Sequence, residues 1–321
     1  MKYVTIPNTD LRVSQLCIGS AQFGAALTEQ DAFALLDQFV KLGGNFIDTA
    51  HVYCNWIPGS RSSSEKMIGK WLTTRGNRNQ LVIATKGAHP DLNTMHISRM
   101  SNPEIEQDIS ESLEYLQTDH IDLYWLHRDD VTIPVGQIIN CLNAQVAAGK
   151  IRYFGASNWT TARLEEAYDY AQKNNVMGFV ANQPLWSLAH SMMGNIPDQT
   201  LVALDEAGTD FHRRTGMAVI PYSAQGHGFF SKLATVGREG ISKADLAQFD
   251  NDTNARRLPR IQELAQKYGV GINHIVLAYL YSQPFVTVPV IGPRHLDQLA
   301  DSASHTDLLL TPDEVAYLQT A

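Results

Sequence analysis

The sequence has 321 residues, of which 44% are hydrophobic and 18% are charged, and its net charge is −8 at pH 7. This balance is typical of a globular chain with enough apolar side chains for a core, and it excludes intrinsic disorder. The acidic net charge disfavours DNA, RNA and anionic membrane surfaces as partners. No apolar run reaches the length of about 18 residues that spans a bilayer.

Targeting and cysteine signals narrow the class further. The N-terminal residues Met1–Pro7 lack the apolar core of a signal peptide. Cys17, Cys54 and Cys141 are odd in number and widely spaced, which suits a reducing compartment and neither a disulfide framework nor a zinc site. We therefore expect a cytoplasmic protein that holds no metal.

The chain begins with a predicted β-hairpin, Tyr3–Val13, whose turn is Pro7–Asp10. After the hairpin, apolar runs alternate with amphipathic segments. Most of the runs are nearly continuous, as in parallel strands that are covered on both faces. They centre on residues 16–20, 45–49, 81–86, 121–127, 153–157, 179–183, 217–222 and 286–291.

The segments between these runs carry helix signals. Thr28 with Asp31 forms a capping box, and Asn102 before Pro103 is a suitable N-cap with proline in the first turn. Eight strand signals alternating with helices, most at a spacing of roughly 30–40 residues, predict a single domain over residues 1–321, a (β/α)8 TIM barrel. A doubly wound sheet is the competing fold, but residues 19–24 lack its G-x-G-x-x-G turn.

Two connections are unusually long for a compact domain. The first runs from His190 to about Gly208 after the sixth strand, and the second from Gly226 to about Ala255 after the seventh. Long loops of this kind are usually lids or binding loops.

Four polar residues lie at or just beyond the ends of successive apolar runs, where parallel α/β sheets form their active sites. Asp48, Lys86 and His127 end the second, third and fourth runs, and Tyr53 follows Asp48 by five residues. A buried lysine is costly unless it is paired, so we expect Asp48 to be the partner of Lys86. Beside this cation we expect a depressed pKa for Tyr53. His127 could hydrogen-bond the same substrate oxygen as Tyr53. These four residues together suit proton transfer to a carbonyl oxygen as it becomes an alkoxide.

Each of these residues also has an ordinary interpretation. Tyr53 is then a half-buried tyrosine, Lys86 a surface lysine at a strand end, His127 a core histidine and Asp48 a turn cap. A lysine at the end of a barrel strand also suits a Schiff base, so an aldolase that uses Lys86 is an alternative enzyme class.

In their order and spacing, these motifs resemble the aldo-keto reductase superfamily over nearly the whole chain. The Asp48-x4-Tyr53 run, Lys86 after Thr85 and His127 after Leu126 match the family's catalytic tetrad. The resemblance implies reversible reduction of an aldehyde or ketone by a nicotinamide cofactor. Tyr53 is then the general acid and base, Lys86 held by Asp48 stabilises its phenolate, and His127 orients the carbonyl.

Residues 222–232 are similar to those of bacterial reductases that also resemble the potassium-channel β-subunit. This similarity motivates another interpretation of a different class, a cofactor-binding sensor or regulatory subunit. The chain departs from the family at Ala224-Gln225, where an aliphatic residue and glycine are usual, and at Gly292-Pro293, where a lysine-serine pair is common.

The resemblance also implies a set of residues that bind the cofactor. They belong to the two nicotinamide-carboxamide segments, the segment whose aromatic ring stacks on the nicotinamide, and the adenosine phosphate site. The set is Ser157, Asn158, Gln183, Tyr222, Ser223, Gly226, Lys232, Gly292, Arg294, Gln298 and Ser302.

The cofactor preference depends on Arg294. This arginine precedes a predicted short helix, and a guanidinium beside a helix N-terminus suits a phosphate. No acidic residue precedes Asp297 in this stretch to grip a ribose 2′-hydroxyl. We predict NADP(H), with NAD(H) as the other possibility.

Three residues near the presumed mouth are candidates for contact with a small-molecule carbonyl or alcohol. They are Trp56, Arg128 and Trp186. Tryptophans stack on sugar or aromatic rings, so we expect a sugar or polyol derivative, with a small aromatic aldehyde as the alternative. The ordinary interpretation is that both tryptophans only pack the loops.

Overall fold

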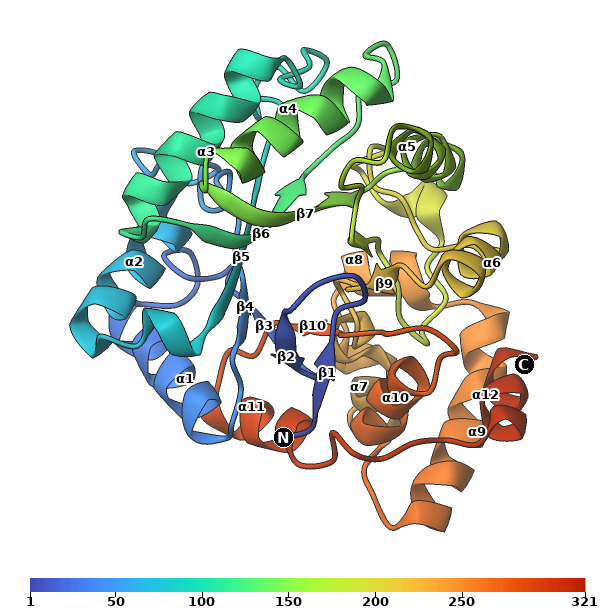
Figure 1. Ribbon diagram of the computed structural model, residues 1–321. Coiled ribbons are helices and arrows are strands. Elements are labelled where there is room, and N and C mark those ends of the chain that lie inside the picture. The colour runs from blue at the N-terminus through green and yellow to red at the C-terminus, as the bar shows by residue number, and fades with distance from the viewer. Residues whose placement is uncertain (321) are drawn as a thin grey trace.

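The computed structural model describes residues 1–320, in which eight parallel strands curl around a common axis with helices outside them (Figure 1). The strands lie in the order β10-β3-β4-β5-β6-β7-β8-β9. This arrangement is consistent with the predicted (β/α)8 fold. The strand bounds are β3 Cys17–Gly19, β4 Phe46–Asp48, β5 Val82–Gly87, β6 Ile121–Leu126, β7 Ile151–Ser157, β8 Ala181–Gln183, β9 Ala218–Val219 and β10 Val290–Ile291.

Backbone hydrogen bonds also link the two ends of this strand order. The N–H of Val219 in β9 donates to the carbonyl of Val286 at 2.9 Å, and the N–H of Val288 donates back to Val219 at 2.9 Å. The segment that leads into β10 therefore lies against β9.

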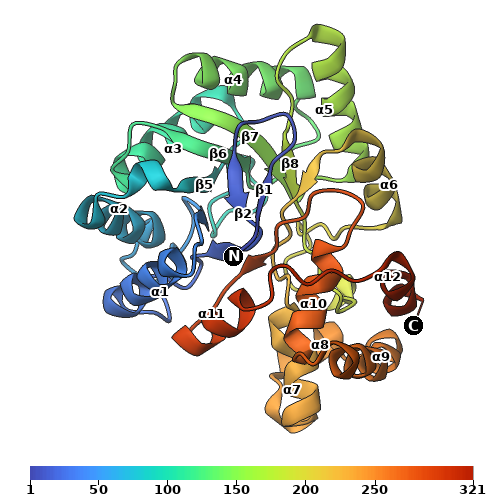
Figure 2. The same ribbon diagram turned by 60° about the horizontal axis from the view of Figure 1, so that its bottom comes forward.

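The helices follow the strands and cover their outer faces (Figures 1 and 2). Six strands, β3 to β8, are each followed by one α-helix before the next strand, and several helices follow each of β9 and β10. The bounds are α1 Glu29–Lys41, α2 Ser63–Arg75, α3 Asn102–Leu116, α4 Val135–Ala147, α5 Thr161–Asn174, α6 Glu206–Thr215, α7 Phe229–Thr235, α8 Lys243–Phe249, α9 Asp252–Tyr268, α10 Ile272–Tyr281, α11 Leu296–Ala303 and α12 Pro312–Gln319.

An N-terminal hairpin lies across the end of the sheet that faces the viewer in Figure 1. Its strands β1 (Tyr3–Thr5) and β2 (Arg12–Ser14) are antiparallel. Ile6, Leu11 and Val13 belong to the same buried cluster as strand residues such as Phe46 and Trp125. Since this cluster contains no helix residue, it fills the interior of the curled sheet, and the hairpin covers one end of it.

Two local features differ from the expectations drawn from the sequence. The Thr28–Asp31 capping box is present, but α3 is capped by Ser101 with Glu104 rather than by Asn102. The hydroxyl and backbone N–H of Ser101 both donate to the Glu104 carboxylate, at 2.5 and 3.2 Å. The capping box therefore places the helix start one residue earlier than the Asn-Pro pair suggests.

The segment after β9, which we expected to be a long loop, is largely helical. It contains α7 and α8 because Phe229, Phe230 and Phe249 are buried in a second core cluster. Ser242 caps α8 by accepting a hydrogen bond from the N–H of Asp245. The segment after β8 has only a short turn of 3-10 helix, Met193–Asn195, before α6.

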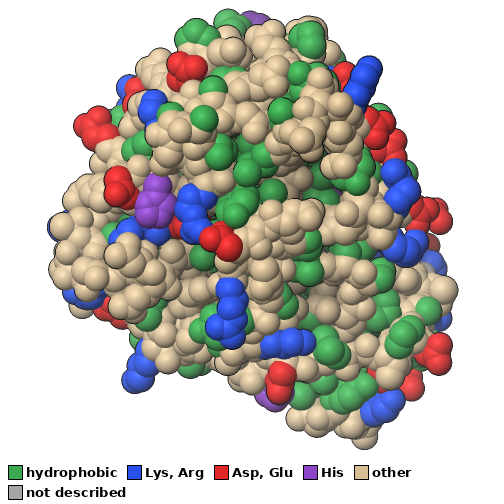
Figure 3. Space-filling view, viewed as in Figure 1, with side chains coloured by type: hydrophobic (Ala, Val, Ile, Leu, Met, Phe, Trp, Pro, Cys, Tyr) green, Lys and Arg blue, Asp and Glu red, His purple; other side chains and the backbone are tan. Residues whose placement is uncertain are grey.

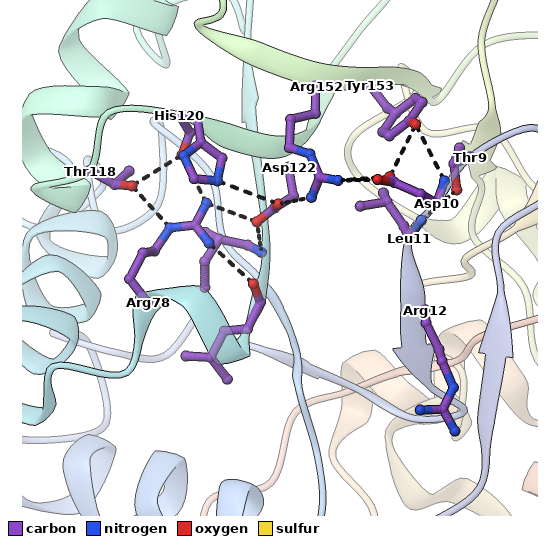
Figure 4. Close-up of polar contacts among 12 residues, drawn as sticks. Thr9, Asp10, Leu11, Arg12, Arg78, Thr118, His120, Asp122, Arg152 and Tyr153 are labelled. Atoms are coloured by element: carbon purple, nitrogen blue, oxygen red, sulfur yellow. Dashed lines mark hydrogen bonds and ion pairs between the residues drawn. The ribbon is translucent and has the colours of Figure 1, made fainter.

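A charge network ties the hairpin to the sheet on the face shown in Figure 3, where basic, acidic and histidine side chains lie side by side. The Asp122 carboxylate on β6 pairs with Arg78 at 2.8 Å and Arg152 at 2.7 Å. Arg152 also pairs with Asp10 in the hairpin turn at 2.7 Å (Figure 4). This network lies at the amino ends of the strands, and the candidate site lies at the opposite, carboxyl ends.

Candidate active site

The register of the sheet brings the predicted tetrad residues together at the carboxyl ends of the strands. Asp48 is the last residue of β4, Lys86 lies near the end of β5, and His127 directly follows β6. Lys86 is paired in register with Trp125, so both strands reach the same level. Tyr53 is in the turn-rich segment between β4 and α2.

Lys86 is the centre of this cluster. Its Nζ donates to Asp48 Oδ2, to the carbonyl of Thr49 at 2.8 Å and to the Tyr53 hydroxyl at 3.1 Å. The side chains of Lys86 and Asp48 are only 1% and 2% exposed. The prediction that Asp48 pairs with Lys86, with Tyr53 beside them, is confirmed, whereas the contact with the Thr49 carbonyl was not predicted.

The second oxygen of Asp48 is also satisfied. Asp48 Oδ1 accepts from Trp125 Nε1 at 3.0 Å and from Gln183 Nε2 at 3.1 Å. A buried carboxylate with both oxygens bonded is held in one orientation. Asp48 therefore fixes the position of Lys86 and connects it to the cofactor candidate Gln183.

The pKa of Tyr53 corrects our expectation from the sequence. Burial of the hydroxyl raises this pKa above its ordinary value, and the nearby charge of Lys86 lowers it only in part. For Lys86, burial favours the neutral amine, but the charge of Asp48 and the contact with Tyr53 outweigh burial and raise the pKa. At neutral pH the cluster therefore holds an ammonium beside a neutral phenol that has a proton to give.

His127 faces the same phenol. Its ring lies 6.0 Å from the ring of Tyr53 and 4.7 Å from the ring of His89, both edge to face. Burial lowers the pKa of His127, and the charges of His89, Arg128 and Lys86 lower it further. Its Nδ1 is buried and has no hydrogen-bond partner within residues 1–320. The imidazole is therefore neutral, with a polar atom that the protein leaves unbonded.

A second polar group continues the site along β7, β8 and β9. The Ser157 hydroxyl donates to the carbonyl of Gln183 at 2.9 Å, and Asn158 Nδ2 donates to Ser157 Oγ at 3.2 Å. The Tyr222 hydroxyl donates to Asn158 Oδ1 at 2.7 Å. Four of the predicted cofactor residues thus form one connected group, which Gln183 joins to Asp48.

The remaining cofactor candidates lie around α7, α10 and α11. Ser302 is buried, and its hydroxyl accepts from Gln225 at 3.0 Å and from Asn273 at 3.3 Å. The backbone N–H of Arg294 donates to Gln298 Oε1 at 2.9 Å. The Arg294 side chain is exposed and pairs with no carboxylate in the part of the chain described. Near the start of α11, the Arg294 side chain therefore has no carboxylate partner among the described residues, whereas the Ser302 hydroxyl already accepts two hydrogen bonds.

Four candidates between these two groups, Ser223, Gly226, Lys232 and Gly292, have distinct settings. Ser223 and Gly226 have left-handed backbone conformations, and Lys232 in α7 lies 3.9 Å from Asp245. Gly292 has open space where a side chain would begin.

The three predicted substrate residues have different environments. Trp56 is 49% exposed, and its ring lies 6.4 Å from that of Tyr53. Arg128 is buried, and its guanidinium donates to Thr200 at 2.7 Å, to Asp198 at 2.9 Å and to the carbonyl of His127 at 2.8 Å. These three hydrogen bonds tie the loop after β8 to the site.

Trp186 lies among aromatic side chains. Its ring packs against Tyr279 and Phe285, with centroids 6.0 and 6.2 Å away. It belongs to the periphery of the second core cluster, as the ordinary interpretation of this tryptophan proposed. Trp56 is the most exposed of the three and lies beside Tyr53.

A cavity next to His127 shows residues that the sequence analysis missed. Its volume is about 490 Å³, and it is lined by His89, Leu92, Met95, Pro197, Asp198, Gln199 and Thr200. His89, three residues after Lys86, was the available signal for this wall. Another hollow, of about 590 Å³, lies at the end of α3 and is lined by Arg78, Leu113, Glu114, Gln117, Thr118 and Asp119. None of its lining residues contacts the tetrad, so we assign the first cavity to the site.

Comparison with known proteins identifies the family of this protein. The model of the aldo/keto reductase family matches residues 15–321, and the chain therefore belongs to this family. The chain is 31% identical to an uncharacterized oxidoreductase, YrpG, of Bacillus subtilis, covering 99% of this chain and 95% of that protein. It is 30% identical to norsolorinic acid reductase B of Aspergillus parasiticus, covering 98% of this chain and 82% of that protein.

Further comparisons agree with this assignment. Aryl-alcohol dehydrogenase (NADP+) of Phanerodontia chrysosporium is 28% identical, with 97% of this chain and 83% of that protein covered. The solved structure of the thermostable aldo-keto reductase Tm1743, in complex with the inhibitor epalrestat, has the same fold. It aligns with a TM-score of 0.73 at 22% identity, covering 100% of this chain and 99% of that one. The family is one of oxidoreductases that generally use NAD(P)H.

Two features are absent from residues 1–320. No helix there is long and apolar enough to cross a membrane. Within the same residues, no group of three or more His, Cys, Asp and Glu side chains is arranged to hold a metal ion.

Proposed function

We propose that the protein reversibly reduces the carbonyl group of an aldehyde or ketone with NADP(H), with Tyr53 as the proton donor. The observation that carries this proposal is the Lys86 ammonium, which is bonded to both Asp48 and Tyr53 beside a neutral His127. A nicotinamide cofactor would supply the hydride. The connected group of Ser157, Asn158, Gln183 and Tyr222 offers the amides and hydroxyls that would hold the nicotinamide.

Each side chain of the tetrad would have a distinct role in the proton transfer. A carbonyl oxygen between Tyr53 and His127 would accept a hydrogen bond from the imidazole, which polarises the carbonyl. The Tyr53 hydroxyl would then give its proton to this oxygen as negative charge develops on it. Lys86, fixed by Asp48, would stabilise the phenolate that remains. In the oxidative direction the same phenolate would take the proton of the alcohol.

The aldolase alternative loses support from the state of Lys86. A Schiff base requires a neutral amine as nucleophile. Here the ammonium has three acceptors and a raised pKa, so the neutral amine is disfavoured at neutral pH.

We infer that the substrate carries a ring, and that an aromatic aldehyde or ketone fits better than a sugar. Trp56 offers an exposed aromatic face beside Tyr53, and Leu92 and Met95 make one wall of the cavity apolar. Arg128, which we expected to bind a polar substrate, already donates three hydrogen bonds within the protein. The relatives that are named for norsolorinic acid and aryl alcohols support the same direction.

The deciding experiment compares Tyr53→Phe with the wild type. Loss of the general acid should lower kcat by about 10²- to 10⁴-fold, while the NADPH dissociation constant, measured by fluorescence titration, stays within about twofold. Tyr317→Phe, at an exposed tyrosine in α12, is the matched control and should change neither quantity. Unchanged turnover in Tyr53→Phe would refute the assignment.

A further inference from the structure

The segment that carries Tyr53 is bonded on both sides by the residue at which α2 begins. The Ser62 hydroxyl donates to the carbonyl of His51 at 2.6 Å, and the Ser62 N–H donates to Asn55 Oδ1 at 2.7 Å. His51 lies two residues before Tyr53 in the chain, and Asn55 lies two residues after it. Ser62 therefore fixes the ends of the short turn in which the tyrosine lies.

Ser62 makes these bonds in place of the contact that a serine at its position usually makes. It is the N-cap of α2, where a hydroxyl normally accepts from a backbone N–H of the first helical turn, but its side chain makes no such bond. Ser62 is also fully buried in a left-handed backbone conformation, with φ 49° and ψ 37°. This conformation is unfavourable for a residue other than glycine, and such strain is concentrated at functional sites.

The residue after Tyr53 is constrained in a similar way. Cys54 has a φ of 72° and is fully buried, and its thiol donates to the carbonyl of Phe23 at 3.1 Å. On the other side, the N–H of Tyr53 donates to the carbonyl of Ala50 at 3.0 Å. Because its neighbours are fixed, the position of the Tyr53 hydroxyl depends on the few bonds that hold this turn.

The first turn of α2 also contacts the surroundings of Lys86. Ser64 Oγ lies 2.9 Å from Thr49 Oγ1, and the carbonyl of Thr49 is one of the acceptors of the Lys86 ammonium. The hydroxyl of Thr85, the residue before Lys86, donates to Glu65 Oε1 at 2.5 Å. The start of one helix therefore holds both the ammonium and the turn that carries the phenol.

We propose that Ser62 is a positioning residue, which holds the Tyr53 hydroxyl within hydrogen-bond distance of the Lys86 ammonium. The contact that it maintains is 3.1 Å long. This inference rests on the proposed function, because it takes Tyr53 to be the proton donor. Ser62 acts through the chain on either side of the tyrosine and takes no part in the proton transfer itself.

The charges around the phenol give this position a measurable consequence. Burial raises the pKa of Tyr53, whereas Lys86 on β5 lowers it, Asp48 on β4 raises it and Arg128 after β6 lowers it. The imidazole of His127, which also faces the phenol, is neutral because burial lowers its pKa. If the hydroxyl moves away from Lys86, its pKa rises further. The phenolate that acts as base in alcohol oxidation then forms at higher pH.

The test is Ser62→Gly, because glycine tolerates the left-handed conformation and keeps the N–H that bonds Asn55, while the hydroxyl is removed. The single-turnover rate of aldehyde reduction should fall about tenfold or more, since a displacement of about 1 Å can cost about a hundredfold. The NADPH dissociation constant should stay within about twofold. The single-turnover rate of alcohol oxidation should reach half its maximum at a higher pH than in the wild type.

A second variant removes the other bond of Ser62. Asn55→Ala deletes the acceptor of its N–H, so it should lower the same rate and move the pH profile in the same direction. Ser101→Gly is the matched control, because Ser101 is the N-cap of α3 and its hydroxyl bonds Glu104. This control should leave both the rate and the pH profile unchanged.

Circular dichroism and the urea midpoint establish that each variant is folded. The inference is overturned if folded Ser62→Gly keeps the wild-type rate, or if its rate falls without a shift of the pH profile. If Ser62→Gly does not fold, the same two outcomes are judged from Asn55→Ala. Unchanged turnover in Tyr53→Phe would instead count against the proposed function, whatever the result at Ser62.

Discussion

The buried ion pair between Lys86 and Asp48 leads to a prediction about stability that does not depend on any substrate. Lys86→Met leaves the Asp48 carboxylate buried, with only Trp125 and Gln183 as donors. Asp48→Asn leaves the Lys86 ammonium buried beside neutral acceptors alone, among them the Thr49 carbonyl and the Tyr53 hydroxyl. Removing one partner of a buried pair typically costs about 3–5 kcal/mol, because the remaining charge is uncompensated.

The double variant removes both charges and should therefore cost less than the sum of the single changes. We expect a coupling free energy of about 2–3 kcal/mol, at the upper end for residues in direct contact. The assay is urea unfolding at pH 7.5, monitored by both fluorescence and circular dichroism. Coincident transitions by the two methods would show that unfolding is two-state.

An exposed ion pair of the same chain provides the matched control. Lys70 Nζ lies 2.6 Å from Glu29, and the two side chains are 57% and 49% exposed. Lys70→Met should cost below about 1 kcal/mol, because solvent screens this pair. If Lys86→Met costs no more than Lys70→Met, or if the two changes at the buried pair are additive, the reasoning fails.

Two further predictions concern the cofactor phosphate and acid stability. Arg294→Ala should weaken NADPH by about ten- to a hundredfold, since charge-assisted contacts to a phosphate are worth roughly 1.5–3 kcal/mol, and should leave NADH unchanged; equal losses in a titration of both would exclude this role. His212 is buried against Phe285, and burial lowers its pKa to about 4. Below about pH 6.5, His212 of the unfolded chain therefore binds a proton, whereas the buried His212 of the folded chain stays neutral. The contribution of neutral His212 to the free energy of unfolding is complete above pH 6.5. It is lost as the pH falls towards 4, by up to about 3 kcal/mol. In urea titrations between pH 7.5 and 4.5, His212→Asn should show a shallower pH dependence than the wild type, and an unchanged slope would count against the assignment.

The tetrad was predictable because each residue stands at a fixed place relative to an apolar run. Asp48, Lys86 and His127 lie at or just beyond the carboxyl ends of three successive strands, and the parallel register brings them to one end of the sheet. The partner of Lys86 followed from the cost of an unpaired buried ammonium. The pKa of Tyr53 did not follow, because the sequence shows the neighbouring charge but not the depth of burial that outweighs it.

Residues whose partners lie far along the chain were the ones that the sequence did not place. Arg128 directly follows His127, but two of its donors bond Asp198 and Thr200, in a loop 70 and 72 residues further on. His227 meets Asp245 only because the segment between them folds into helices, where the sequence suggested a loop. Local sequence patterns predict where strands end and where helices are capped. Pairings between residues far apart in the sequence depend instead on how the loops fold over the sheet.

The most direct test of the proposed reaction follows the transferred hydrogen itself. NADPH carrying deuterium at the transferable C4 position is mixed with the wild type and an aromatic aldehyde, and the alcohol is examined by mass spectrometry. The account predicts one deuterium on the carbinol carbon of the product. It predicts product formation at least about a hundredfold slower in Tyr53→Phe. An alcohol without deuterium, or an aldehyde that is consumed only as a borohydride-trappable adduct of Lys86, would contradict it.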